Sequence, residues 1–134
     1  MNIDRHDSMR ITTHDDVVRV RQCVRDWAVG LGFSLVDQTK LVTAASELAR
    51  NTLIYGGGGL LTLEAVTNER KRGLRLTFVD QGPGIADIDL ALKDGYTTGD
   101  GLGLGLSGAR RLTQDFQITS KPGEGTRVVI ARWN

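Results

Sequence analysis

The chain has 134 residues, a formal net charge of +1 and 40% hydrophobic residues. This size suits one domain with a single core, so we expect residues 1–134 to form one domain rather than two. The near-neutral charge excludes a strongly basic surface for nucleic acid or for a membrane. A single cysteine excludes an internal disulfide and a multi-cysteine metal site. Because we find neither a signal peptide nor an apolar run that could span a bilayer, we expect a cytoplasmic protein.

Two capping motifs predict two helices in the first half of the chain. Thr13-His14-Asp15-Asp16 fits a capping box after a short predicted strand at 9–13, and the helix ends at the glycines near residue 30. Ser34-Leu35-Val36-Asp37 fits a second capping box, and this helix is expected to reach about Tyr55. Helical spacing predicts two core-facing stripes, namely Val17, Val20, Val24, Trp27, Ala28 and Leu31, and then Leu41, Ala44, Ala45, Leu48 and Thr52.

Strands dominate the prediction for the second half. Residues 60–67 and 73–79 predict a hairpin with one buried face, and residues 116–120 and 126–133 predict two further strands. Between these pairs lie a short predicted helix at 85–94 and a longer one at 104–114. This order predicts an α/β (α+β) sandwich, with a mixed, mainly antiparallel sheet and helices on one face.

Glu47 and Asn51 are four residues apart on the second predicted helix and therefore project from one side of it. Taken alone, such a pair is more often a solvated helix face. Alternatively, the carboxylate can accept a proton from an attacking hydroxyl. The amide oxygen is a hard ligand suited to Mg²⁺, which takes few protein ligands beside phosphates.

Asp80-Gln81-Gly82-Pro83-Gly84 follows a predicted strand and is open to two interpretations. Such a sequence is often only a turn. The carboxylate could instead accept a hydrogen bond from the exocyclic amine of adenine, with Gly82 and Gly84 allowing the backbone close to the ring. Gly123-Glu124-Gly125-Thr126 could likewise be a hairpin turn. It would bring Thr126 beside Asp80 if the last strand lies next to the strand that ends at Asp80.

The glycine-rich run Gly101-Leu102-Gly103-Leu104-Gly105 directly precedes a predicted helix. Although Gly103, Gly105 and Gly108 spell G-x-G-x-x-G, no apolar strand precedes them, so we reject a dinucleotide fingerprint. No G-K-[ST] follows, which excludes a P-loop. A flexible lid without a ligand remains an alternative, but a phosphate cradle explains why the glycines adjoin a helix N-terminus.

In this order, the motifs resemble the ATP-binding domain shared by gyrase, Hsp90-type chaperones, sensor histidine kinases and MutL, the GHKL or Bergerat-fold superfamily. The matching segments are Glu47…Asn51 (N box), Asp80-x-Gly-x-Gly84 (G1), Gly101–Gly105 (G2) and Gly123-x-Gly-Thr126. Within it, the chain is most similar to the serine-protein kinases of the stressosome switch, RsbT-type. That likeness is carried by Ser46-Glu47-Leu48-Ala49-Arg50-Asn51, Asp80-Gln81-Gly82-Pro83-Gly84-Ile85 and Gly95-Tyr96-Thr97-Thr98.

The resemblance implies ATP and Mg²⁺ as cofactors and gives each matching residue a role. Glu47 would be the general base, Asn51 the Mg²⁺ ligand, and Asp80 the acceptor for the adenine amine with Thr126 as its neighbour. The remaining nucleotide contacts that it implies are Gly82, Gly84, Thr98, Gly101, Leu102, Gly103, Leu104 and Gly105. Arg50 departs from the small residue that is commoner at its position. Its side chain could contact phosphate, a partner protein or solvent, and the sequence does not decide among the three.

The resemblance also implies partners. The substrate would be a serine of a STAS-type antagonist protein in a stressosome-like assembly, and the kinase would then activate a PP2C-type phosphatase regulator. Neither nucleic acid nor a membrane is expected as a partner. An anti-sigma factor that sequesters its target and uses ATP only to shape its surface is the alternative function. A fragment of a larger ATPase is less favoured, because both ends of the chain look complete.

Overall fold

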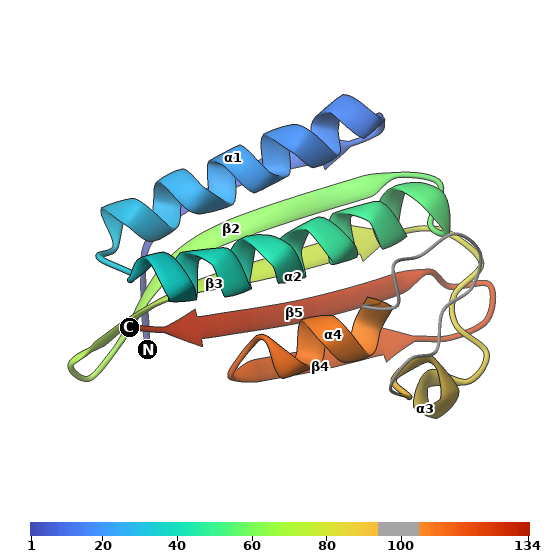
Figure 1. Cartoon of the computed structure of the whole chain (residues 1–134). Helices are drawn as coiled ribbons and strands as arrows, with labels where there is room; N and C mark the ends of the chain where they lie inside the picture. Colours follow the sequence, from blue (N-terminus) through green and yellow to red (C-terminus); the bar gives the residue numbers. More distant parts are fainter. Residues whose placement is uncertain (94–104) are drawn as a thin grey trace.

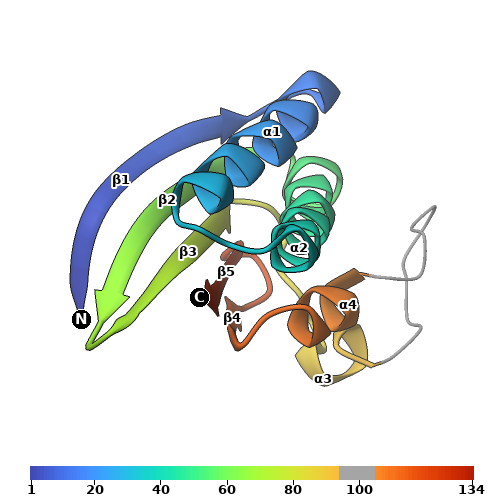
Figure 2. The same ribbon diagram turned by 60° about the vertical axis from the view of Figure 1, so that its left-hand side comes forward.

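One curved five-stranded sheet, in the order β1-β2-β3-β5-β4, supports the fold. The computed structural model describes residues 1–93 and 105–134. The strands are β1 (Asn2–Ile11), β2 (Gly59–Asn68), β3 (Lys71–Asp80), β4 (Asp115–Ser120) and β5 (Thr126–Trp133). The helices are α1 (His14–Gly30), α2 (Leu35–Ile54), α3 (Ile88–Ala91) and α4 (Gly105–Arg111). In Figures 1 and 2, α1, α2 and α4 lie on the same side of the sheet, which curves around them.

This arrangement confirms the predicted sandwich with helices on one face. The prediction allowed for a mixed sheet, but all four strand pairs of the described ranges are antiparallel. The expected hairpin is formed by β2 and β3, and β5 then pairs with β3 on its other side. Strand β3 is therefore central, and its carboxyl end at Asp80 is flanked by β2 and β5.

Side-chain caps start both long helices where the sequence predicts. The Thr13 hydroxyl accepts the Asp16 amide at 3.2 Å, and the Asp16 carboxylate accepts the Thr13 amide at 3.0 Å, which completes the first capping box. Hydrogen bonds from the Thr12 amide and the Arg19 guanidinium hold the pKa of Asp16 well below its usual range. At α2, the Ser34 hydroxyl accepts the Asp37 amide at 3.2 Å.

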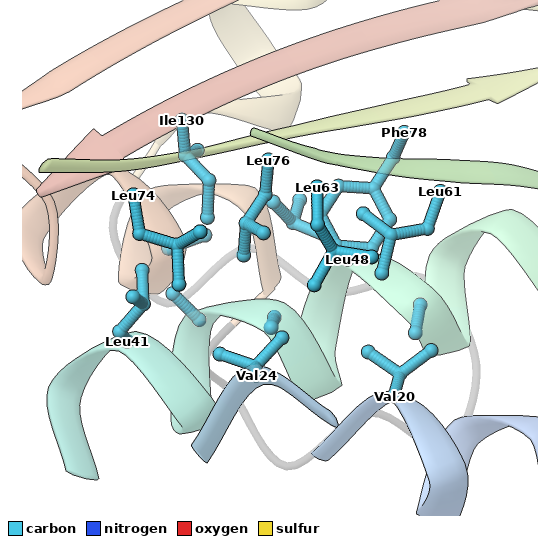
Figure 3. Close-up of a cluster of buried hydrophobic side chains, with 14 of the residues drawn as sticks. Val20, Val24, Leu41, Leu48, Leu61, Leu63, Leu74, Leu76, Phe78 and Ile130 are labelled. Carbon is cyan, nitrogen blue, oxygen red and sulfur yellow. The ribbon is translucent and has the colours of Figure 1, made fainter. Parts of the chain in front are cut away.

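The core lies between the helices and the sheet. Every residue of the two predicted helical stripes is buried except Leu31, which is half-buried. Figure 3 shows Val20 and Val24 of α1 and Leu41 and Leu48 of α2 facing side chains from the sheet. Those sheet residues are Leu61, Leu63, Leu74, Leu76, Phe78 and Ile130, all of them at most 2% exposed. Both helices pack as expected, because each has a single apolar stripe and the sheet is the apolar surface against which that stripe can be buried.

Three elements differ from the prediction by three residues or more at a boundary. Strand β1 runs over Asn2–Ile11 rather than 9–13, because antiparallel pairing with β2 recruits a polar segment that has no alternating pattern. Residue 94, the expected end of the helix at 85–94, lies outside the described residues. Within residues 85–93 the helix is the single turn of α3, and the Ile85 amide instead donates to the Ser120 hydroxyl at 2.8 Å. Helix α4 ends at Arg111 rather than 114, because the Gln114 amide donates to the Ala131 carbonyl of β5 at 3.1 Å.

Arg132 of β5 ties two helices to the sheet. Its guanidinium donates to the Leu112 carbonyl, just after α4, at 3.0 Å and to the Asp37 carboxylate, in the first turn of α2, at 2.7 Å. The hydrogen bond from Arg132 holds the pKa of Asp37 below its usual value. The two contacts of Arg132 therefore fix the start of α2 and the end of α4 against one strand.

None of the helices in the described ranges is long and apolar enough to cross a membrane.

Candidate functional site

A cleft of about 640 Å³ opens where the end of α2, the end of β3, the start of β5 and the segment 83–91 meet. This volume lies within the range of ligand-binding clefts in proteins. Phe78 and Val128 line the cleft from the sheet, and Leu106 lines it from α4. Six residues predicted from the sequence line it together, namely Glu47, Asn51, Asp80, Gly84, Gly105 and Thr126.

Glu47 and Asn51 reach the cleft from one side of α2, as their helical spacing predicts. Glu47 is only 8% exposed, so its carboxylate is largely removed from bulk water. The Asn51 carbonyl accepts the amides of Tyr55 and Gly56 at 3.0 and 3.1 Å, which ends the helix one turn later. The pair thus projects from the last two turns of a capped helix whose other side is anchored in the core.

Asp80 lies at the last position of β3, between Gly59 of β2 and Thr126 of β5 in the strand register. Its Oδ1 accepts the Gly82 amide at 2.9 Å, which holds the carboxylate against the turn that follows. A Cβ on Gly56 would lie 2.4 Å from the Asp80 Cγ, so the end of α2 approaches this carboxylate only because residue 56 is glycine. These contacts fix Asp80 while leaving it on the wall of the cleft.

The condition stated for Thr126 is met, because β5 is the neighbour of β3 and pairs Thr126 with Asp80. Directly paired residues project from the same face of a sheet, here the face that carries the helices. The Thr126 hydroxyl lies 2.8 Å from the Ser120 hydroxyl, which also accepts the Ile85 amide. One hydroxyl pair therefore connects β4, β5 and the start of segment 83–91.

The two glycines after Asp80 have different neighbours. Gly84 lines the cleft with φ +77°, and a Cβ there would lie 2.1 Å from the Lys121 carbonyl oxygen, so another residue would displace the β4–β5 turn. Gly82 is not among the residues that line the cleft. A Cβ on Gly82 would lie 2.7 Å from the Gly56 Cα, so it is backbone packing at the end of α2 that requires a glycine at this position.

Part of the predicted phosphate site falls outside the described residues. Thr98, Gly101, Leu102, Gly103 and Leu104 all lie there. Gly105, the last glycine of the run, is the first residue of α4 and lies on the cleft. The predicted helix after the glycines therefore exists and begins beside the pair on α2.

Sequence reasoning missed the apolar wall of the cleft. Ile54 and Tyr55, at the end of α2, are 49% and 43% exposed, and both line the cleft with Ile85 and Leu90. Large apolar side chains left in solvent around a cleft are typical of a ligand-binding groove or a protein interaction site. Two apolar residues directly before a run of glycines were the available signal.

The charges around the cleft are unequal. Glu47, Asp80 and Asp87 contribute carboxylates, and Arg50 is the one cationic side chain among the described residues that line it. Within the described ranges, no three His, Cys, Asp or Glu side chains gather as a metal site. The amide oxygen of Asn51 fits Mg²⁺ as a single protein ligand, since this ion commonly takes most of its other ligands from phosphates and water.

Comparison with known proteins identifies the family of the chain. Residues 36–133 match the model of the "Histidine kinase-, DNA gyrase B-, and HSP90-like ATPase" family. The chain is 46% identical to the serine/threonine-protein kinase RsbT of Bacillus subtilis over 93% of its own length and 94% of that protein. It is 27% identical to an anti-sigma F factor from a Thermoanaerobacter species over 84% of this chain and 82% of that one.

Solved structures support the same fold. The RsbU and RsbW domains of a Mycobacterium tuberculosis protein match with a TM-score of 0.64 and 20% identity, over 94% of this chain and 32% of that structure. The histidine kinase domain of a blue-light activated kinase from Erythrobacter litoralis matches with a TM-score of 0.56 over 87% of this chain and 58% of that one. With the family match over 36–133, these findings show that the chain belongs to the histidine kinase-, DNA gyrase B- and HSP90-like ATPase family.

Proposed function

We propose that this protein is a serine/threonine-protein kinase that transfers the terminal phosphate of ATP to a serine of a partner protein. The observation that carries this proposal is the convergence of Glu47 from α2 and Asp80 from β3 on one cleft. Glu47 offers a general base for the acceptor hydroxyl, and Asp80 offers a carboxylate that can recognise adenine. One ATP bound in the cleft would therefore reach from Asp80 to Glu47. The 46% identity to a serine/threonine-protein kinase supports protein serine or threonine as the acceptor.

Adenine binds at the sheet end of the cleft. The Asp80 carboxylate accepts a hydrogen bond from the exocyclic amine of adenine, and the neighbouring Thr126 hydroxyl contributes a further polar contact. The ring lies against the apolar side chains that line this end, such as Ile85 and Val128. Burial of the ring provides affinity, while the carboxylate selects a base that carries an amine.

Phosphoryl transfer takes place beside α2. Glu47 accepts the proton of the attacking serine hydroxyl while a bond forms between the serine oxygen and the terminal phosphorus. The bond from that phosphorus to the bridging oxygen of ADP breaks, and ADP leaves with the electron pair. A Mg²⁺ ion held by Asn51 supplies charge neutralisation at the phosphates when it is bound. The protein contributes mainly positioning, which its rigid, capped helix provides.

The acceptor is a serine of a STAS-type antagonist, and a PP2C-type phosphatase regulator is the second partner. Both follow from the resemblance to the stressosome switch kinases, and the high coverage of the Bacillus subtilis relative supports them. In such partner switching, phosphorylation of the antagonist releases the kinase to activate the phosphatase.

The test is incubation with ATP, Mg²⁺ and STAS proteins from the same genome, followed by intact mass measurement. We expect a gain of one phosphate on a serine of one STAS protein. Glu47→Gln removes the base while keeping the shape of the side chain, and we expect transfer to fall by about a hundredfold or more. Equal transfer by Glu47→Gln and wild type would contradict the base assignment, and no transfer to any STAS protein would contradict the substrate.

A second candidate function is that of an anti-sigma factor, favoured by the 27% identity to anti-sigma F factors. In that case ATP shapes the surface that holds the sigma factor. Stable co-purification with a sigma factor, without phosphate transfer to a STAS protein, would favour this function over the first.

A further inference from the structure

Arg50 and Glu47 form a loose ion pair on the wall of the cleft. The Arg50 Nη1 lies 4.0 Å from the Glu47 Oε1, which is too far for a hydrogen bond. The Arg50 side chain is 32% exposed and that of Glu47 only 10%. Within residues 1–93 and 105–134 no hydrogen bond is formed by either side chain. The guanidinium is thus held by charge alone and keeps all its donors available.

Helix geometry places Arg50 next to the reacting groups. With about 100° of rotation per residue, Asn51 lies about 40° to one side of Glu47 on α2 and Arg50 about 60° to the other. A terminal phosphate close to both Glu47 and Asn51 is therefore within reach of the long arginine side chain. All three residues line the cleft.

The distribution of charge around the cleft favours movement of the Arg50 side chain toward a bound triphosphate. Among the described lining residues it is the single cation, and Glu47, Asp80 and Asp87 contribute carboxylates. A triphosphate brings several more negative charges close to Glu47. A guanidinium binds phosphate through two parallel hydrogen bonds, which is a stronger contact than a carboxylate 4.0 Å away.

We propose that Arg50 recognises the third phosphate of ATP, leaving Glu47 for it when ATP binds and staying with Glu47 when ADP binds. The inference rests on the proposed function, because it takes the terminal phosphate to lie beside Glu47. Arg50 then distinguishes ATP from ADP and uncovers the carboxylate only when a transferable phosphate is present. In the absence of ATP, the Arg50 guanidinium stays beside the Glu47 carboxylate, the proposed general base.

The first test is calorimetry of ATP and ADP binding, with Mg²⁺, to four proteins: wild type, Arg50→Ala, Arg50→Lys and Lys40→Ala. Lys40 is exposed on the same helix and does not line the cleft, so its removal is a control for the change in net charge. We expect Arg50→Ala to lose about tenfold in affinity for ATP and less than about twofold for ADP. Arg50→Lys should recover part of the loss, since a point charge lacks the planar fork. Lys40→Ala should bind both nucleotides like wild type.

A double-mutant cycle with Glu47→Gln provides a second readout that does not depend on activity. If the pair separates on ATP binding, the effects of Glu47→Gln and Arg50→Ala on ATP affinity will not add, whereas their effects on ADP affinity will. Circular dichroism of each variant checks that the helix is intact.

Equal losses for ATP and ADP in Arg50→Ala, or no loss for either, would overturn this inference and leave the nucleotide site standing. Additive effects on ATP affinity would overturn the separation of the pair. Failure of wild type to bind either nucleotide would overturn the proposed function together with this inference.

Discussion

Asp80 and Thr126 are direct register partners on neighbouring antiparallel strands, although 46 positions separate them in the sequence. Both continue the core-facing series of their strands, which contains Phe78 on β3 and Val128 on β5. The same alternation that buries the core therefore delivers a carboxylate and a hydroxyl to the cleft at the strand ends. Asp80 and Thr126 therefore form a polar continuation of the core face, and the register of the sheet sets their positions.

Asp80→Asn should weaken ATP and ADP binding alike, by about ten- to a hundredfold, because a charged acceptor for the adenine amine becomes a neutral one. The asparagine oxygen can still accept the Gly82 amide, which Asp80 Oδ1 now accepts at 2.9 Å, so the turn should persist. Calorimetry with both nucleotides, with thermal unfolding as the fold control, tests this. A loss confined to ATP would show that Asp80 does not contact the base.

Gly56→Ala should also lower nucleotide affinity, by displacing Asp80 instead of changing its chemistry. The added methyl group would lie 2.4 Å from the Asp80 Cγ, so the carboxylate must rotate away from its present position. Gly30→Ala is the matched control, since a Cβ there meets nothing within 4 Å. We expect the control to bind ATP normally and to be as stable as wild type or slightly more so. Normal ATP affinity in Gly56→Ala would mean that the position of Asp80 is unimportant for binding.

The elements that the sequence predicts well are those with a local signal. Capping residues Thr13 and Ser34 give the starts of α1 and α2 correctly, and glycines mark their ends. The pairing of β5 with β3 was foreseen only as a condition for placing Thr126, because strand order depends on contacts distant in sequence. The long strand β1 was missed over most of its length, since its residues are polar and its pairing with β2 alone makes it a strand.

At the site, too, the features with a local sequence signal were predictable and those that depend on distant contacts or rotamers were not. Helical spacing alone puts Glu47 and Asn51 on one side of α2, and the structure adds Asp80 from β3 to the same cleft. What spacing does not reveal is the ion pair of Glu47 with Arg50, because its existence depends on rotamers. Nor does the sequence reveal the close backbone neighbour of Gly82, Gly56, which requires a glycine at position 82 whether or not a ligand is bound.

The neighbouring residues Leu60 and Leu61 of β2 test the assignment of the two sheet faces. Leu61 is fully buried and points toward the helices, whereas Leu60 is 41% exposed on the opposite face. Leu61→Ala should destabilise the fold by roughly 3 kcal/mol, and Leu60→Ala by less than about 1 kcal/mol. Urea unfolding of the two variants measures both values. Similar losses for the two would mean that the outer face is covered as well.

The ion pair of Asp37 with Arg132 should make stability depend on acidity. Because the guanidinium lowers the pKa of Asp37 in the folded protein below its ordinary value, the unfolded chain takes up the proton first as pH falls. The contribution of the ion pair to stability is therefore complete above the unfolded pKa and is lost as pH falls through the lower, folded pKa.

Asp37→Asn should be less stable than wild type at pH 7, with the difference shrinking as the pH is lowered below about 4. Asp26→Asn, at an exposed position on α1, is the control for the loss of one carboxylate from a helix and should be as stable as wild type at pH 7. Urea unfolding at a series of pH values measures the difference, and a gap between Asp37→Asn and wild type that stays constant down to pH 2 would rule out the titration of Asp37 as its source.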